Sequence, residues 1–297
     1  MSKIHPSWDK KRKRGDRFDG TLIKELDPLH VITPMLYPNR CDNEAFFMEE
    51  LDITRLRAYV REKNDASPDQ EVPYSTFHLL VISLLKLLCL RSKMNRFIAN
   101  RLMYQRNELT ASFIVKKKFA DDGAEALAII NAGADDNVNT LHEKIAEQIT
   151  SGRSDTLDKS SENMDIVSRM PRRLTRLFVR FICFLDRIGH CPKGLIDTDP
   201  YYTSVLISNL GSLGLKAGYH HLTNWGTCSV FVALGRIREV EVTEADGTKS
   251  IHDMVDLGIT IDERLADGYY YAKTLRLLKH IVQTPEILEQ PLNTPIE

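Results

Sequence analysis

The sequence predicts an α/β (α+β) domain in which a mixed sheet carries its helices mainly on one face. Helical and strand patterns are interspersed along the chain without a repeating βαβ rhythm, and the last third is rich in strand patterns. One helix pattern is apolar on nearly all sides, which indicates burial against a sheet. An apolar content of 42% in 297 residues is sufficient for one sizeable core.

The first half of this domain alternates helical and strand patterns. Asp52 can cap a short helix, and Ser75 precedes the apolar helix expected at residues 76–90. Two β segments are expected at 111–123 and 125–133, around a turn at residues 121–123. Thr140 has capping-box spacing to a glutamate and predicts the start of a third helix.

The second half begins with a polar stretch, residues 151–165, which we expect to be a loop. Residues 172–189 predict a strongly amphipathic helix with arginines on one side. Strands follow at 202–211, 229–243 and 252–262, the last two joined by a hairpin turn at Asp246 and Gly247. A helix that begins at Gly268 closes the domain.

Charge and cysteine usage exclude several classes of protein. The formal net charge is −1, so no overall field favours nucleic acid, and we expect none as a partner. KKRKR at residues 10–14 is interpreted as part of a charged, irregular N-terminal arm spanning residues 1–39, with nucleic-acid binding as the alternative. The five cysteines show no metal-ligand spacing, which predicts reduced thiols, no metal and a cytoplasmic location. No apolar run reaches the roughly 20 residues of a membrane span.

Three motifs, in this order along the chain, resemble one family. MEELDITRLRAYV at residues 48–60 is similar to its first helix after its first strand. VLISNLGSLG at 205–214 resembles its SNLG strand, and DERLADG at 262–268 resembles the DHRxxDG signature of dihydrolipoyl acyltransferase catalytic domains. The last motif also resembles the HHxxxDG corner of chloramphenicol acetyltransferases. The likeness covers roughly residues 40–288, within an expected domain of residues 40–297.

The resemblance implies a chloramphenicol acetyltransferase-like homotrimer that transfers acyl groups between coenzyme A and a second acceptor in a channel between subunits. Ser208 stands at the position of the serine that donates a hydrogen bond to the oxyanion, and Asn209 beside it is a candidate for binding substrate. Asp267 stands at the aspartate that forms a structural ion pair. The other corner positions are Asp262, Arg264 and Gly268.

Glu263 occupies the position of the family's catalytic histidine. A free glutamic acid has a pKa of about 4.3 and a thiol about 8.5, a mismatch of roughly 6 kcal/mol for proton transfer. Burial in an apolar channel can raise a carboxyl pKa by about 2–4 units, so a desolvated, unpaired Glu263 can serve as a base. The alternative is a vestigial Glu263 that pairs with an arginine in a pseudoenzyme.

Two adjacent histidines, His220 and His221, offer a replacement base if one of them reaches the channel; the alternative is a structural or surface role. On an extended segment they face opposite ways and cannot both ligate one metal. The amphipathic helix falls in an apparent insertion at about residues 151–195. It can pack on the protein's own core, cover the acyl pocket or lie on a membrane surface.

No lipoyl-type lysine hairpin or Ala/Pro-rich linker precedes residue 40, so we expect a free-standing acyltransferase with no covalently bound cofactor. A coenzyme A thioester is the expected substrate, and the acceptor is a small molecule or a group on a separate carrier. The alternative function is a non-catalytic homotrimer that binds acyl-CoA or a protein partner as scaffold or regulator.

Overall fold

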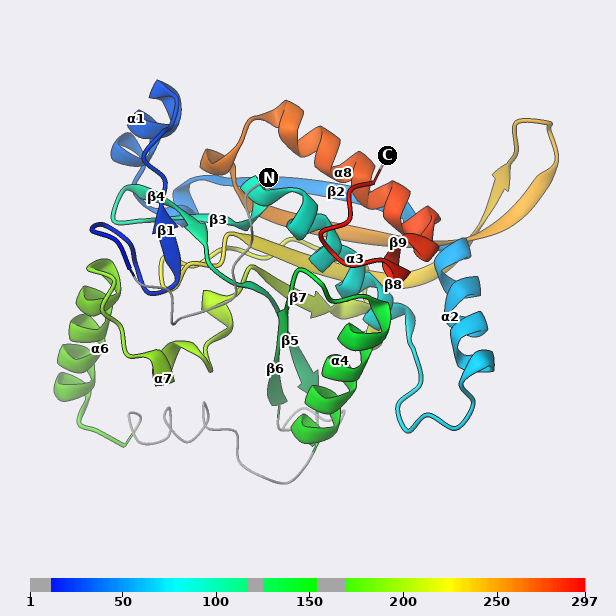
Figure 1. Cartoon of the computed structure of the whole chain (residues 1–297), viewed down its shortest axis with the longest axis horizontal. Helices are drawn as coiled ribbons and strands as arrows, with labels where there is room; N and C mark the ends of the chain where they lie inside the picture. Colours follow the sequence, from blue (N-terminus) through cyan, green and yellow to red (C-terminus); the bar gives the residue numbers. More distant parts are fainter. Residues whose placement is uncertain (1–11, 117–124, 154–168, 297) are drawn as a thin grey trace.

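The computed structural model describes residues 12–116, 125–153 and 169–296, and its centre is a six-stranded mixed sheet (Figure 1). The strand order is β2-β9-β8-β7-β5-β6. β7 pairs in parallel with β5 and β8, and the other pairs are antiparallel. The strands are β2 (Glu44–Asp52), β5 (Leu109–Lys116), β6 (Glu125–Ala132), β7 (Val205–Asn209), β8 (Val230–Thr243) and β9 (Lys249–Asp262).

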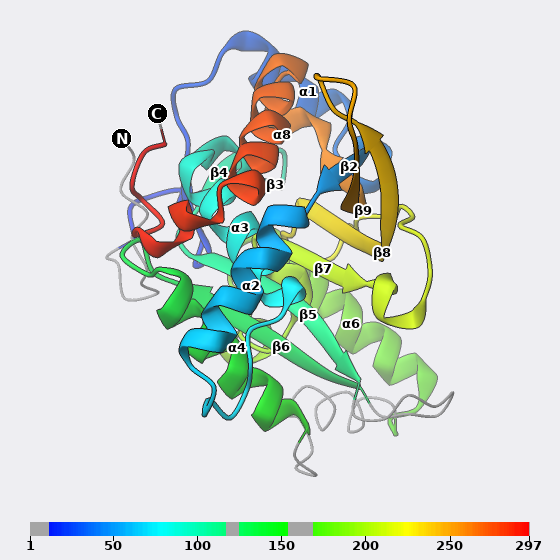
Figure 2. The ribbon, with the colours of Figure 1, turned by 90° about the vertical axis from the view of Figure 1, so that its right-hand side faces the viewer.

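Four helices cover one face of this sheet, as the sequence predicts (Figure 2). They are α2 (Thr54–Ala66), α3 (Thr76–Leu90), α4 (Val138–Arg153) and α8 (Gly268–Gln283). Alternate strand residues such as Val232 and Leu257 face these helices in one continuous apolar core. The predicted fold class is therefore confirmed.

Capping residues in the sequence predicted the start of α3 correctly and that of α4 only approximately. Ser75 caps α3, because its hydroxyl accepts the His78 N–H at 3.1 Å. α4 begins earlier than expected: the Asn137 side chain, not Thr140, accepts the backbone N–H groups of the first turn. α4 also continues through residues 151–153, where a loop was expected.

A smaller three-stranded sheet, order β1-β4-β3, lies beside the first. Its strands are β1 (Gly20–Leu22), β3 (Arg96–Ala99) and β4 (Leu102–Arg106). β1 and α1 (Pro28–Leu36) show that the expectation of an irregular arm is wrong for its described part, residues 12–39, and Phe18 is buried. Where the arm ends and the domain begins stays a prediction.

The remaining helices are α6 (Arg172–Arg187) and α7 (Lys193–Ile196), with short 3-10 turns η1 (Arg40–Asp42), η2 (Ser92–Asn95), η3 (Pro200–Tyr202), η4 (Leu210–Leu213), η5 (Glu263–Leu265) and η6 (Pro285–Glu289). The predicted turn at 121–123 and the predicted loop from residue 154 to 165 lie outside the described residues. Among the described helices, none combines the length and apolar character needed to cross a bilayer.

Candidate functional site

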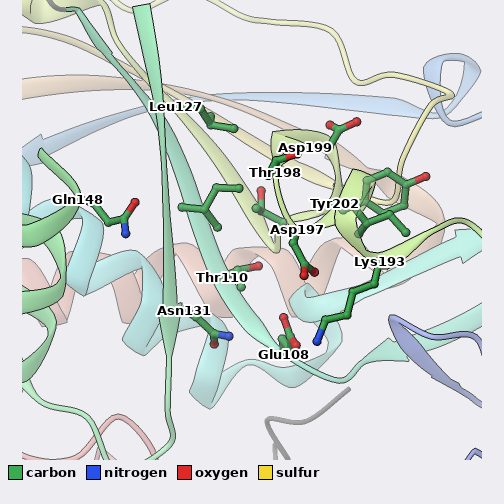
Figure 3. Close-up of a pocket in the computed structure, with 13 residues that line it drawn as sticks. Glu108, Thr110, Leu127, Asn131, Gln148, Lys193, Asp197, Thr198, Asp199 and Tyr202 are labelled. Carbon is green, nitrogen blue, oxygen red and sulfur yellow. The ribbon is translucent and has the colours of Figure 1, made fainter. Parts of the chain in front are cut away.

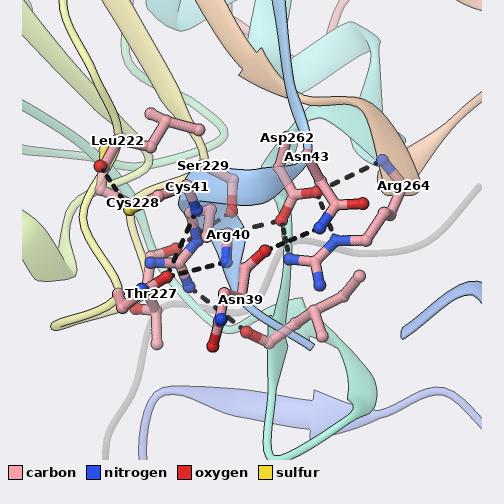
Figure 4. Close-up of polar contacts among 12 residues, drawn as sticks. Asn39, Arg40, Cys41, Asn43, Leu222, Thr227, Cys228, Ser229, Asp262 and Arg264 are labelled. Carbon is pink, nitrogen blue, oxygen red and sulfur yellow. Dashed lines mark hydrogen bonds and ion pairs between the residues drawn. The ribbon is translucent and has the colours of Figure 1, made fainter. Parts of the chain in front are cut away.

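The corner at the end of β9 is built on a buried ion pair between Asp262 and Arg264 (Figure 4). The guanidinium donates two hydrogen bonds to the carboxylate, Nε to Oδ1 at 2.7 Å and Nη2 to Oδ2 at 2.6 Å. Both side chains are almost fully buried. Such a bidentate pair orients both groups rigidly, so the corner has one well-defined shape.

A second buried arginine ties this corner to distant segments. Arg40 donates to the carbonyls of Thr223 and Gly226 at 2.6 and 3.1 Å, and its Nε lies 3.9 Å from Asp262 Oδ2. Burial lowers the pKa of Arg40, and the Asp262 carboxylate acts against that shift. The network thus joins the end of β9 to the chain before β2 and before β8.

Glu263 projects from this rigid frame. Its backbone N–H donates to the Asn43 carbonyl at 2.9 Å, and its carbonyl accepts from the Tyr271 hydroxyl at 3.4 Å. Its side chain is exposed, and among the described residues it has no hydrogen bond or ion pair. The expected alternative, pairing with an arginine, is therefore wrong within the described chain, because Arg264 is committed to Asp262.

Within residues 12–116, 125–153 and 169–296, Asp267 forms no ion pair, although the family resemblance implies one. It is exposed and caps α8, since its carboxylate accepts the Tyr270 N–H at 2.8 Å. That backbone hydrogen bond is the main reason why the pKa of Asp267 is lowered. Gly268 follows as the first residue of α8. The buried ion pair of this corner is instead the one made by Asp262 with Arg264.

Ser208 lies near the end of β7, on the face of the sheet that α2, α3, α4 and α8 leave open. Leu206, two residues earlier, points to that face and packs with Phe231 and Ala233. Ser208 is half-buried, and its hydroxyl has no hydrogen-bond partner in the described part of the chain. The hydroxyl is therefore available to donate to a substrate.

Strand register separates Ser208 from Glu263 within one chain. Ser208 pairs with Ala233, which pairs with Gly258 on β9. Glu263 lies five residues beyond Gly258, which is roughly 17 Å along the strand direction. The two predicted catalytic residues thus lie on different strands and well apart along the strand direction, and one chain does not bring them together.

Asn209 faces the other side of the sheet and lines a cavity of about 330 Å³ between the end of β7 and the start of α3. Its side chain accepts the Ser212 N–H at 3.1 Å, which shapes the turn after β7. Phe77, Leu80 and Leu234 give this cavity a largely apolar lining. The predicted substrate-binding residue therefore does border a cavity.

His220 and His221 lie on a segment that crosses the open face of the sheet. A Cβ on Gly258 would stand 2.0 Å from the Gly218 carbonyl oxygen, so this close crossing requires a glycine. His220 stacks on Phe231 with ring centroids 4.3 Å apart, and the two histidine rings stack at 4.6 Å. The expectation that they face opposite ways is wrong. His220 shares its face of the sheet with Ser208.

The sequence reading missed a cavity of about 460 Å³ beneath the chain that joins α7 to β7 (Figure 3). Glu108 and Asp197 border it, with Lys193 pointing toward Glu108. Burial raises the pKa values of Glu108, Asp197 and Asp199, although the Trp225 Nε1–H donates to Asp199 at 2.6 Å. The close pair of aspartates in DTDP was the available signal. The predicted site residues do not line this cavity.

Two of the cysteines are buried enough for their thiols to be affected, and the described residues contain no cluster of possible metal ligands. Burial raises the pKa of the Cys89 and Cys191 thiols to about 11, which makes both poor nucleophiles near neutral pH. In the described residues, no group of three or more His, Cys, Asp and Glu side chains is arranged to hold a metal ion.

The fold and the C-terminal motifs are matched in known proteins. Residues 199–289 match the model of the 2-oxoacid dehydrogenases acyltransferase (catalytic domain) family. The cubic core of a pyruvate dehydrogenase multienzyme complex is 16% identical with a TM-score of 0.60, covering 90% of this chain and 93% of that one. Dihydrolipoamide acetyltransferase of Azotobacter vinelandii, investigated for the catalytic roles of a serine, a histidine and an asparagine, is 16% identical with a TM-score of 0.59 and coverages of 90% and 93%.

Chloramphenicol acetyltransferase is 11% identical with a TM-score of 0.54, covering 89% of this chain and 99% of that one. No match was found among curated proteins. These structures show that the chain has a chloramphenicol acetyltransferase-like fold. The match to the acyltransferase family model covers residues 199–289, which contain both C-terminal motifs.

Proposed function

We propose that the protein transfers an acyl group between a coenzyme A thioester and a thiol or hydroxyl acceptor, at sites formed between copies of the chain in a homotrimer. The observation that carries this proposal is the separation of Ser208 from a rigidly presented Glu263. Two incomplete half-sites on one chain become one complete site when the end of β7 in one copy meets the corner of another.

In this proposal Glu263 accepts the proton of the acceptor thiol or hydroxyl while the acceptor's sulfur or oxygen attacks the thioester carbonyl carbon. The carbonyl oxygen becomes an oxyanion, to which the Ser208 hydroxyl donates a hydrogen bond. Collapse re-forms the carbonyl and breaks the bond to the coenzyme A sulfur, which receives the proton from Glu263.

Glu263 is exposed in the single chain, and the proposed assembly would bury it beside the corner. α1 contacts the corner, and Arg264 Nη1 donates to the Tyr37 carbonyl at 2.6 Å. Apolar side chains here are exposed, including Leu36 at 66% and Phe46 at 50%. Such a surface beside the corner supports its burial by a second copy, which would desolvate the carboxylate.

A non-catalytic homotrimer that binds acyl-CoA or a protein partner is the second candidate. It is favoured by the combination of a glutamate at the family's histidine position and its exposure in the single chain. His220 provides a third arrangement in which a histidine on the face of Ser208 takes the proton.

The test is acyl transfer from acetyl-CoA to a panel of thiols and alcohols by the purified protein. We expect turnover that falls at least 100-fold in Glu263→Gln, the usual size of a general-base contribution, and is regained in Glu263→His. Loss in His220→Gln with full activity in Glu263→Gln would assign the proton to His220. Binding of acetyl-CoA without turnover in all variants would favour the scaffold.

The acceptor is a small molecule or a group on a separate carrier, and the free cysteines fit the proposed cytoplasmic location. Sedimentation at micromolar concentration should give a species of three 34.0 kDa chains, whereas the 34.0 kDa monomer would contradict sites between copies.

A further inference from the structure

α6 lies at the edge of the molecule (Figure 1), and the rest of the described chain leaves an apolar strip of this helix uncovered. Leu177 is 66% exposed and Phe184 55%, although side chains of this kind are normally buried. None of the residues of this helix is buried. The strip consists of Leu174, Leu177, Phe178, Phe181, Phe184 and, just after the helix, Ile188. Among the described residues, the expected packing on the protein's own core is therefore made by the other side of the helix and not by this strip.

The helix is nevertheless held in one orientation. Ile182 packs against the cluster that contains Phe18 and Tyr202. The Asp186 carboxylate forms an ion pair with Arg17 at 2.8 Å, and the Asp186 carbonyl accepts from the same guanidinium. This one-sided attachment fixes which direction the apolar strip faces.

Helical geometry divides α6 into three sectors. At 3.6 residues per turn, the strip centred on Phe181 lies about 120° around the axis from the attached side at Ile182 and Asp186. The arginines fill the third sector, about 120° from both. They are Arg172, Arg173, Arg176, Arg180 and Arg187, all exposed.

The basic charge of this region has little acidic compensation. Asp186 is the only acidic residue of α6, and it pairs with Arg17, which also pairs with Asp19. Arg12, Lys13 and Arg14 are exposed and lie just ahead of Arg17, so the basic stretch continues beside the helix. Because the whole chain has a net charge of −1, this is a local concentration.

A second copy of α6 and an anionic bilayer are the two candidate partners of the strip, and they place these arginines in different electrostatic environments. If two α6 helices packed antiparallel through their strips, both arginine rows would lie on the same side, and like charges would repel. An anionic bilayer accepts the apolar strip below its headgroups and pairs the arginines with phosphates, while the attached side keeps the domain above the surface. The charge pattern favours the bilayer.

We propose that α6 is an interfacial anchor that docks this protein onto anionic lipid bilayers, with the strip around Phe181 inserted and the arginine sector at the headgroups. Nothing in this assignment depends on acyl transfer. The protein lies on the membrane through this helix and does not cross it.

Co-sedimentation of the full chain with vesicles tests the anchor, using phosphatidylcholine with and without 30% phosphatidylglycerol. We expect binding to the anionic vesicles that weakens as salt increases. Phe181→Asp should abolish it, and Arg176→Gln with Arg180→Gln should weaken it about 30-fold, because each arginine near an anionic surface contributes roughly fivefold.

Two controls match these changes elsewhere on the surface. Arg61→Gln with Arg276→Gln removes the same charge, and Ile251→Asp places the same charge on an exposed side chain of the β8–β9 hairpin. Both should bind like the native chain, and all variants should keep its circular dichroism. Equal binding by native chain and Phe181→Asp would overturn the proposal. Absence of vesicle binding by the native chain would also overturn it. If Phe181→Asp then reduced self-association, the strip would be assigned to contact with a second copy.

Discussion

The corner around Glu263 and the helix α6 distribute polarity in opposite ways. At the corner, the charges of Asp262 and Arg264 are buried and satisfy one another, and a single carboxylate projects from them. On α6, apolar side chains such as Leu177 are exposed, although the helix itself is firmly attached.

The difference distinguishes interactions that are satisfied within the chain from a surface that requires a binding partner. A buried ion pair persists only where its geometry is nearly ideal, since desolvation is costly. The exposed apolar strip of α6 has no stabilising partner among the described residues, and exposed apolar patches of this kind are typical of surfaces that bind something else. The charged groups of the corner are therefore paired within the chain and hold Glu263 in place, whereas the apolar strip of α6 requires a partner surface.

The largest expected effect comes from breaking the frame. Arg264→Met leaves the Asp262 carboxylate buried without its bidentate partner, and we expect a loss of about 3–5 kcal/mol in the free energy of unfolding. Urea denaturation followed by fluorescence measures it.

The matched change on α6 is Leu177→Ser, which removes an exposed apolar side chain that contributes little to the core. It should leave the urea midpoint close to that of the native chain. A comparable loss in both variants would erase the contrast between the two regions.

A smaller and pH-dependent effect is expected at Asp267. Its folded pKa is lowered, chiefly by the hydrogen bond from the Tyr270 N–H, so its ionised form stabilises the fold above the unfolded pKa of about 3.9. That contribution disappears as the pH falls through the lower folded pKa. Asp267→Asn keeps a capping oxygen but not the charge.

The thermal midpoints of native protein and Asp267→Asn should therefore differ most at pH 7 and converge near pH 2. A difference that does not change with pH would show that the carboxylate charge at Asp267 plays no part in capping α8.

Much of the fold follows from local patterns. The apolar run from Thr76 to Leu90, preceded by a serine cap, predicts α3 with the bounds that it has, because burial and capping act within that segment. The corner motif was likewise recognised from consecutive residues, 262–268. Both features could be predicted because the residues that determine them are close in the sequence.

Contacts between distant segments could not be predicted in the same way. β1 is three residues long and is positioned by its pairing with β4. A strand this short has no periodicity from which it could be predicted. The buried Arg40 likewise donates to the carbonyls of Thr223 and Gly226, which lie far from it in the sequence. The stacking of His220 on Phe231 likewise depends on the segment that crosses the sheet.

The most direct test of sites shared between copies mixes two inactive variants. Glu263→Gln retains Ser208, and Ser208→Ala retains Glu263, so a mixed homotrimer contains some interfaces at which both native residues meet. After unfolding and refolding an equimolar mixture, we predict about one quarter of native acyl transfer, from the random pairing of subunits. A mixture no more active than either variant alone, beside an active native protein, would contradict sites formed between copies.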